Sequence, residues 1–476
     1  MDGRVDLDLQ LRAFARTNAL DGNGRATEGW AFDGQQVSGP HGALTTDPGS
    51  YLGPTLRVRP HQRVRITFHN QLAEPSIVHW HGLDVSEAND GHPRFAIAPG
   101  ASYVYNFEVA QRPGTYWYHP HPDRRTGPQV YMGLAGVFIV EDPDDVARGL
   151  PTDDHDVALL LQDRTINRDG ALVYAPDAMV GQLGDRVFVN GHPDATIAVD
   201  RGSYRLRVIN GSNARIYRLA WSNDAPITVI GTDGGLVAVA SDKPYVMLAP
   251  GERLELWADF ANVAHDEVRL ESRAFDAGTS MGMGMGMGGM MGGRGTGARN
   301  ATPPAPPNGA ALGVCRFAIS GLGPRRTKPT VLTQLERIPD AVVNAQQPHR
   351  FDVSMSMMRW QLNGSRFAMT EVAENERFKL GAIEDWEFTN LSGTMAMPHP
   401  IHVHGAQFQI VSRSGAEPGV IDDGLVDDGW KDTFLLRPGE RVRIRRRSTH
   451  AGLFLYHCHN LEHEDAGMMR NFLVET

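Results

Sequence analysis

Apolar and polar residues alternate along many short stretches of this chain. The stretch TLRVRPHQRVRITFHN, residues 55–70, is one example, and a period of two residues is typical of half-buried β-strands. The 52 glycines and 30 prolines supply frequent turns and leave little room for long helices. The pattern therefore predicts an all-β protein.

The strand pattern repeats three times along the chain. Three alternating strands end in an asparagine, at Asn70, Asn210 and Asn390. Each is followed by a Pro-Gly turn that opens a further alternating strand, at Pro99, Pro250 and Pro438. Chance resemblance among strands is the alternative, but two markers that recur in the same order favour three related β-sandwich domains. We place these domains at residues 1–145, 146–325 and 326–476.

Length and charge narrow the possible partners. The 476 residues suit about three domains of roughly 150 residues each. A net charge of −10 without a long basic run argues against nucleic acid or an anionic membrane surface. No apolar run approaches the roughly 20 residues that span a bilayer. The start, MDGRVDLDLQ, is not typical of a signal peptide, so the protein is either cytoplasmic or carries its export signal only before processing.

The positions of the histidine clusters along the chain follow this repeat. Of 19 histidines, ten lie in the clusters HWHG, YHPHP, HPIHVHG and HCHNLEH. His-x-His pairs occur at matching points of the first and third copies, whereas the matching stretch of the second copy, NGSNARIYRLAW, has no histidine. A lone histidine is usually a solvated or core side chain, but paired and repeat-matched histidines favour metal ligands. We expect the first and third copies to face each other and to bring eight imidazoles together.

Such an interface has more imidazoles than one ion needs. Neutral imidazole binds copper, zinc, iron and nickel, and one ion takes about four ligands. The interface is therefore predicted to hold more than one metal ion.

Cys458 lies between His457 and His459 in the sequence, but its side chain is expected to point to the other face of the strand. On an extended strand, successive side chains point to opposite faces. His457 and His459 then share the interface face, while Cys458 points into the interior of the third copy. A buried structural cysteine is the alternative, but it leaves the surrounding histidines without a role.

The interior position predicts a second kind of metal site. His399 and His463 are the two histidines left over from the pairs, and Met468 or the adjacent Met469 can supply a sulfur. A His₂Cys site with a weak axial methionine is the arrangement of an electron-transfer blue copper.

With these motifs the sequence resembles the multicopper oxidases, particularly bacterial laccases and copper-efflux cuprous oxidases. The resemblance covers essentially the whole chain as three cupredoxin-like Greek-key β-sandwich domains, and GTYWYHPHPDRRTGPQVYMGLAGVFIVED looks like the end of their first domain. It implies four copper ions. The type 1 copper would be held by His399, Cys458, His463 and axial Met468, and the type 2 copper by His79 and His402. The type 3 pair would be held by His81, His119, His121, His404, His457 and His459.

The resemblance also implies an activity. Four one-electron oxidations of phenols, aromatic amines or Cu(I) would be coupled to reduction of O₂ to water. Similar enzymes place proton-carrying acids at positions that match Asp90 and Glu464. The resemblance further implies a periplasmic or secreted monomer.

The methionines indicate a copper substrate. Six of 18 lie in SMGMGMGMGGMMGG, residues 280–293, within a predicted loop at 278–312 of the middle domain. Thioether sulfur selects Cu(I), and in an extended segment one side would carry Met281, Met283, Met285 and Met287. The segment resembles the methionine-rich stretches that lie over the type 1 site of cuprous oxidases. The alternative is a low-complexity linker without ligand function.

Other residues near the predicted type 1 site are weaker candidates. Met395 and Met397 precede His399; in copper-efflux oxidases an aspartate and a methionine at these spacings bind Cu(I), so Met395 departs from that pattern. Asp432 is a candidate for hydrogen bonding to substrate near type 1. Met355, Met357 and Met358 suit either Cu(I) binding or core packing, and Cys315 suits a small buried apolar role.

Other classes of function make different demands on the sequence. A copper-storage protein could use the methionine segment, but it would need no Cys–His connection to an oxygen site. A structural protein of this fold would be expected to lack some ligands, yet every ligand position is filled. A copper nitrite reductase normally has fewer domains per chain and fewer His-x-His pairs.

Overall fold

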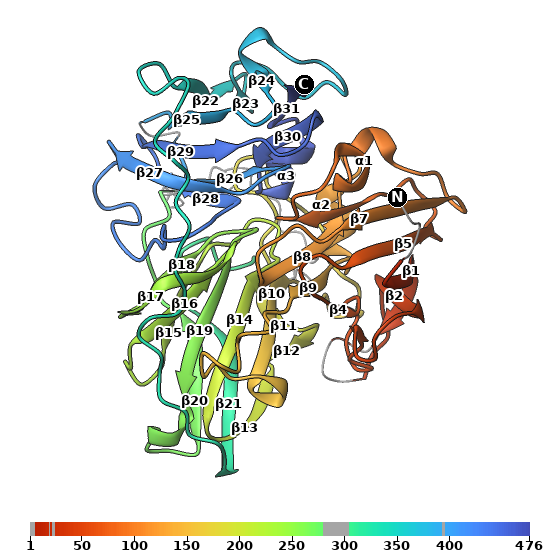
Figure 1. Ribbon diagram of the computed structural model, residues 1–476. Coiled ribbons are helices and arrows are strands. Elements are labelled where there is room, and N and C mark those ends of the chain that lie inside the picture. Colours follow the sequence, from red (N-terminus) through yellow and green to blue (C-terminus); the bar gives the residue numbers. More distant parts are fainter. Residues whose placement is uncertain (1–4, 19, 21–23, 279–303, 393–395) are drawn as a thin grey trace, which may run out of the picture.

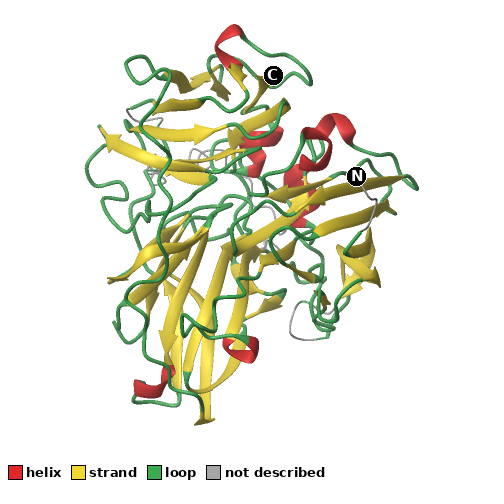
Figure 2. Ribbon diagram, viewed as in Figure 1, coloured by secondary structure: helices red, strands yellow, loops and turns green. Residues whose placement is uncertain are grey.

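The computed structural model describes residues 5–18, 20, 24–278, 304–392 and 396–476. Its regular secondary structure is almost entirely β-strand, as predicted, with a few short helices (Figures 1 and 2). Three consecutive stretches of the chain each form two sheets that enclose an apolar core.

The first stretch forms sheets of order β2-β1-β5-β7 and β3-β4-β9-β8-β6. Their core includes Phe68, Trp80 and Tyr118, all fully buried. The strands are β1 (Leu7–Asn18), β2 (Thr27–Ser38), β3 (Leu44–Thr45), β4 (Thr55–Val58), β5 (Arg63–Asn70), β6 (Val78–His81), β7 (Ser102–Glu108), β8 (Gly114–Pro120) and β9 (Gly136–Val140).

The middle stretch forms sheets of order β12-β11-β10-β14-β19-β16-β17 and β13-β21-β20-β15-β18. Cys315 packs in their core, and burial raises the pKa of its thiol to about 12, so it acts as the small apolar side chain that was predicted. The strands are β10 (Asp156–Arg164), β11 (Arg186–Val189), β12 (His192–Pro193), β13 (Thr196–Arg201), β14 (Ser203–Asn210), β15 (Tyr217–Trp221), β16 (Ile227–Thr232), β17 (Gly235–Lys243), β18 (Val246–Leu248), β19 (Arg253–Asp259), β20 (Glu267–Ser272) and β21 (Leu312–Leu322).

The third stretch forms sheets of order β23-β22-β25-β29-β27 and β24-β31-β30-β26-β28. Cys458 and Met468 lie in its core. The strands are β22 (His349–Ser356), β23 (Arg359–Leu362), β24 (Arg377–Lys379), β25 (Ile383–Asn390), β26 (His399–Val403), β27 (Phe408–Ser414), β28 (Thr433–Leu436), β29 (Arg441–Arg447), β30 (Gly452–Cys458) and β31 (Met469–Glu475).

The repeat seen in the sequence corresponds to equivalent strand pairs. Strands β5, β14 and β25 each pair in parallel with the first strand of their stretch and antiparallel with the strand after the Pro-Gly turn. Each ends in a buried asparagine whose Nδ2 donates to two backbone carbonyls. These bonds hold the loop that leads to the next strand, which in the first and third copies carries histidines.

The first and third sandwiches lie side by side above the middle one (Figure 1). Three short α-helices lie near their contact, α1 (Glu87–Asp90), α2 (Thr126–Tyr131) and α3 (Leu461–Asp465). Asp465 of α3 accepts from the backbone nitrogens of Thr126 and Gly127 at the start of α2 (2.9 and 2.8 Å). Single 3₁₀ turns occur at Pro93–Phe95, Asp153–His155, Phe260–Asn262 and Glu374–Glu376. Within the described ranges, no helix has the length and apolar character needed to cross a membrane.

Candidate metal centre

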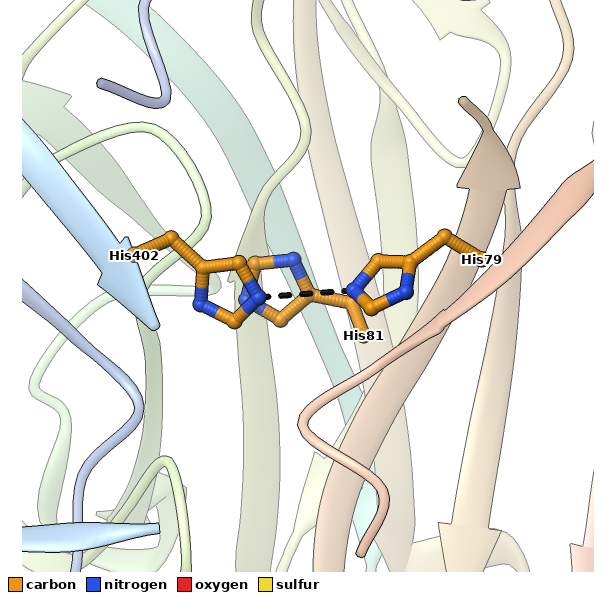
Figure 3. Close-up of side chains that lie close together, drawn as sticks. All are labelled: His79, His81 and His402. Carbon is orange, nitrogen blue, oxygen red and sulfur yellow. Dashed lines mark hydrogen bonds between the residues drawn. The ribbon is translucent and has the colours of Figure 1, made fainter. Parts of the chain in front are cut away.

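Two pairs of neighbouring strands carry the interface histidines. In the first sandwich β6 and β8 pair with His79 opposite His119, and in the third β26 and β30 pair with His402 opposite His457. The two strand pairs meet where the sandwiches touch. Figure 3 shows the rings of His79 and His402 facing each other, with His81 beside them. His79 and His81 both come from β6, and Nε2 of His79 lies 3.3 Å from Nε2 of His402.

The remaining histidines form two groups of three. The possible ligand atoms of each group lie within 4.8 Å of one another. One group contains His81, His119 and His459, and the other contains His121, His404 and His457. All of these side chains are buried.

The contact between His79 and His402 provides a test of whether a metal fits. The Nδ1 atoms of His79 and His402 donate to the backbone carbonyls of Asp90 and Asp432 (2.5 and 2.8 Å). Carbonyls only accept hydrogen bonds, so this assignment leaves both Nε2 atoms of the neutral rings without protons. Two lone pairs then face each other at 3.3 Å. They repel each other unless a cation lies between them, so the residues fit a metal ion.

The other groups repeat this arrangement. His404 Nδ1 contacts Asp90 Oδ2 (2.7 Å), His457 Nδ1 donates to the Cys458 carbonyl (3.1 Å), and the two Nε2 atoms lie 3.0 Å apart. His119 Nδ1 donates to the Pro120 carbonyl (3.0 Å), and its Nε2 has no partner. A metal-binding histidine usually donates its other ring N–H to an oxygen, which fixes the tautomer and the orientation of the ring.

Burial favours the neutral form of seven interface imidazoles. Desolvation lowers the pKa of seven of the eight interface histidines, and neighbouring imidazoles lower most of them further, because a charged ring is costly in a buried cluster. Neutral imidazole is the form that binds metal. The seven are His79, His81, His119, His121, His402, His404 and His459.

Cys458 lies in a separate group inside the third sandwich. Its Sγ is 3.5 Å from His399 Nδ1 and 3.8 Å from His463 Nδ1, and the backbone nitrogen of Asn460 donates to it at 3.4 Å. Burial raises the pKa of the thiol, so the sulfur is unreactive unless a bound metal displaces its proton.

Both methionines proposed as axial ligand follow directly on this group. Met468 is fully buried in the same apolar core as Cys458, and its backbone nitrogen donates to the His463 carbonyl (2.9 Å). Met469 lies on β31 opposite His457. The shared core favours Met468 as the residue that faces the sulfur.

Two buried acids contact the interface histidines. Asp90 contacts His79 through its carbonyl and His404 through its carboxyl, so it joins two metal-binding groups. Burial raises its pKa, and the nearby Asp84 carboxylate adds to the effect. Glu464 lies 3.4 Å from His121 Nε2 and 3.1 Å from His457 Nδ1. Burial by itself would raise its pKa, but the two imidazoles hold the pKa below its usual range.

Asp432 does not lie where a substrate contact was predicted. Its carboxyl is 1% exposed and contacts His81 Nε2 at 3.1 Å, in the interface cluster rather than beside Cys458. Both of its oxygens accept from Arg253 (2.5 and 2.6 Å). The prediction of substrate hydrogen bonding is therefore replaced by a role in orienting His81.

Arg253 is a functional residue that sequence reasoning missed. It comes from β19 of the middle sandwich, which carries no interface histidine, and it is fully buried. The remaining N–H groups of its guanidinium donate to the backbone carbonyls of Thr115, Gly251 and Asp233. All five donors are thus satisfied, and the carboxyl of Asp432 is held rigidly against His81. The available signal was the arginine of the motif APGERLELWADF.

The predicted substrate residues are only partly described. Met397 is 6% exposed and packs in the core that contains Cys458. Met395, Met281, Met283, Met285 and Met287 lie outside the described residues. Of the other candidates, Met357 and Met358 are exposed at the turn between β22 and β23, and Met355 packs partly against the core.

Comparisons with known proteins agree with this geometry. Family models described as multicopper oxidase match residues 33–145 and 342–476. The multicopper oxidase mco of Staphylococcus aureus is 30% identical over 429 residues, which cover 90% of this chain and 83% of that protein. The cell division protein FtsP of Xenorhabdus nematophila is 31% identical over 456 residues, which cover 94% and 87%.

A solved structure extends the likeness to the whole chain. The McoA multicopper oxidase of Aquifex aeolicus superposes with a TM-score of 0.80 at 30% identity and covers 100% of this chain and 97% of that one. The chain belongs to the multicopper oxidases, which are copper-dependent oxidoreductases with cupredoxin-like sandwiches.

We predict that Asp432→Asn weakens both the fold and copper binding. The neutral amide removes the carboxylate that accepts two hydrogen bonds from buried Arg253 and leaves only Asp233, 3.8 Å away, as its counter-charge, which costs up to about 3–5 kcal/mol. Loss of the residue that orients a metal-binding histidine typically lowers metal affinity about 10–100-fold. Thermal unfolding and copper analysis measure the two effects. The exposed control Asp242→Asn breaks an ion pair with Lys328 and should change neither; equal copper retention in both variants would contradict the role of Asp432.

Proposed function

We propose that this chain is a laccase-like oxidase that holds four copper ions and reduces O₂ to water. Type 2 copper would bind His79 and His402, and type 1 copper would bind His399, Cys458, His463 and Met468. The type 3 pair would bind His81, His119, His121, His404, His457 and His459. The observation that carries the proposal is the 3.3 Å contact between the unprotonated Nε2 atoms of His79 and His402, at the shared face of two sandwiches. We also propose that each sandwich is a domain, with boundaries near 145 and 325.

The strand around Cys458 connects the two centres. Copper supplies the one-electron redox steps and the binding of O₂ when it is present. Cys458 points into the third sandwich, while its neighbours His457 and His459 reach the interface cluster. The backbone nitrogen of His459 donates to the Pro400 carbonyl at 2.6 Å, which fixes the strand next to β26. A short covalent path with little freedom to move suits electron transfer between the sites.

Asp90 and Glu464 have the contacts that proton delivery requires. Each is buried and lies within 3.4 Å of ligand imidazoles. Reduction of O₂ to two waters consumes four protons. Asp90, whose pKa is raised, can donate a proton, and the Glu464 carboxylate, whose pKa is lowered, can accept a proton and pass it on. Asp90 lies beside His79 and His404, and Glu464 lies beside His121 and His457. Because His404 shares a group with His121 and His457, both acids reach that group.

The reducing substrate is proposed to be Cu(I) together with phenols or aromatic amines. Gly278, the last described residue before the methionine segment, lies where an added Cβ would be 3.6 Å from Pro398. Pro398 precedes His399, so Gly278 lies near the proposed type 1 site. We propose that thioethers of the residues that follow Gly278 deliver Cu(I), because soft sulfur selects this ion. We propose a periplasmic or secreted monomer.

Copper storage with little turnover is the second candidate, supported by the same methionine segment. It gives no role to the contacts of Asp90 and Glu464 with the interface histidines. One relative is the cell division protein FtsP, but the histidine groups together with Cys458 favour catalysis in this chain. Oxygen uptake separates these candidates.

The first test measures the copper centres. The copper-loaded chain is expected to bind four coppers, to show an intense blue absorption band, and to consume O₂ with a reducing dye. In Cys458→Ser the blue band and O₂ uptake should be lost, because serine cannot supply the thiolate. The control Cys315→Ser, which changes the other buried cysteine, should retain both the blue band and O₂ uptake. Copper binding without O₂ uptake would favour storage.

The second test concerns proton delivery. Asp90→Asn keeps the side-chain volume but removes the acid, so kcat should fall by about 100-fold or more while the blue band stays. The control Asp33→Asn alters a carboxyl that pairs with Arg12 near the surface of the first sandwich and should keep kcat unchanged. A normal kcat in Asp90→Asn would exclude Asp90 as the proton carrier.

The third test concerns the methionine segment. Deletion of residues 280–293 should raise the apparent KM for Cu(I) and leave kcat for an aromatic amine unchanged or higher. A variant of full length with leucine at the six methionines should behave like the deletion, because leucine keeps the apolar character without the sulfur. Unchanged Cu(I) kinetics in both variants would remove the segment from substrate binding.

A further inference from the structure

A loop of the middle sandwich covers the proposed type 1 site. Residues 177–182 lie between β10 and β11, and the carbonyl of Met179 accepts from His463 Nε2 at 2.9 Å. His463 is 1% exposed. The ring edge that faces away from Cys458 is therefore capped by a peptide group from a different sandwich.

Directly after this cap, the loop is fastened to α3 and to the residue that precedes it, Asn460. The carbonyl of Val180 accepts from Asn460 Nδ2 (3.0 Å), and the backbone nitrogen of Gln182 donates to Glu462 Oε2 (2.9 Å). Gly181 has φ +88°, and a Cβ there would lie 2.6 Å from Asn460 Oδ1. Only glycine allows this close approach, so the loop is built to lie against the helix that carries His463.

The loop is also braced internally. Asp177 and Gly181 exchange two backbone hydrogen bonds (3.2 and 2.8 Å). Asp177 Oδ1 accepts from the backbone nitrogens of Met179 and Val180 (2.7 and 2.9 Å). Asp177 and Ala178 are exposed. One peptide group thus separates the imidazole of His463 from exposed residues.

The other described neighbours of the site are closed. His399 is fully buried, and the ring of Trp360, 2% exposed, lies 4.4 Å from the His399 ring and 5.6 Å from the His463 ring. Among the described residues around the two histidines, no ring edge of either is open to a planar donor.

We propose that the loop at 177–182 determines which reductants this enzyme accepts. A donor docks on the outer face of the loop, and its electron crosses the hydrogen bond between the Met179 carbonyl and His463. Each donor loses one electron to the centre that includes Cys458. Four such losses, with four protons, convert one O₂ to two waters. Small one-electron donors are favoured over bulky aromatic ones, which cannot reach the ring. The inference rests on the proposed function.

The test shortens the loop without breaking its base. Replacing Ala178–Val180 by Asn-Gly, a dipeptide that closes tight hairpins, removes the Met179 carbonyl while Asp177 and Gly181 stay paired. The ratio of kcat/KM for a bulky aromatic amine dye to that for hexacyanoferrate(II) should rise at least tenfold. Pulsed EPR of the copper-loaded protein in deuterated water should show faster exchange of the His463 Nε2 proton. The control Asp169→Ala alters a neighbouring exposed turn and should change neither.

A second variant covers the case in which the shortened chain fails to fold. Asp177→Ala removes only the brace of the loop tip and should shift both measurements in the same direction by less. If both variants retain the wild-type ratio and the wild-type proton exchange, the loop does not select the donor. If the wild-type protein shows no blue band or type 1 EPR signal, the proposed function itself fails, which is a separate outcome.

Discussion

The structure depends on electrostatic repulsion between histidine side chains at the contact between the first and third sandwiches. Eight histidines are buried there, and hydrogen bonds to backbone carbonyls direct the lone pairs of facing rings at one another. Neutral rings in such an arrangement repel, and protonation is opposed by burial. Bound cations remove this repulsion. Metal binding therefore also stabilises the contact between the first and third sandwiches. The surrounding sandwiches exclude water from these rings, and this strengthens the repulsion between their lone pairs.

Much of this could be predicted from the sequence, because the fold repeats. Asn70, Asn210 and Asn390 gave a common register, and placing the histidines on that register predicted which copies face each other. The alternation of side chains on a strand separated Cys458 from His457 and His459. These predictions needed only local periodicity and repetition, which a single sequence contains.

What could not be predicted depends on contacts between distant segments. Arg253 lies in a copy without histidines, so nothing near it pointed to the metal centre. Asp432 was assigned to substrate from its place in the chain, whereas the pairing of β26 with β28 carries it to the opposite end of the strand from His399. The cap on His463 comes from a loop with no recognisable motif. In each case tertiary packing, and not local pattern, decides the contact.

The split origin of the interface histidines has a consequence for biosynthesis. One set lies between residues 79 and 121 and the other between 402 and 459, so a site that needs both sets is incomplete until synthesis has passed His459. Such a metal centre cannot template early folding, as a local zinc finger does. Metal uptake must instead follow the pairing of the last strands. Until then, the nascent chain carries two incomplete sets of metal-free imidazoles, and it has to avoid binding other metal ions there.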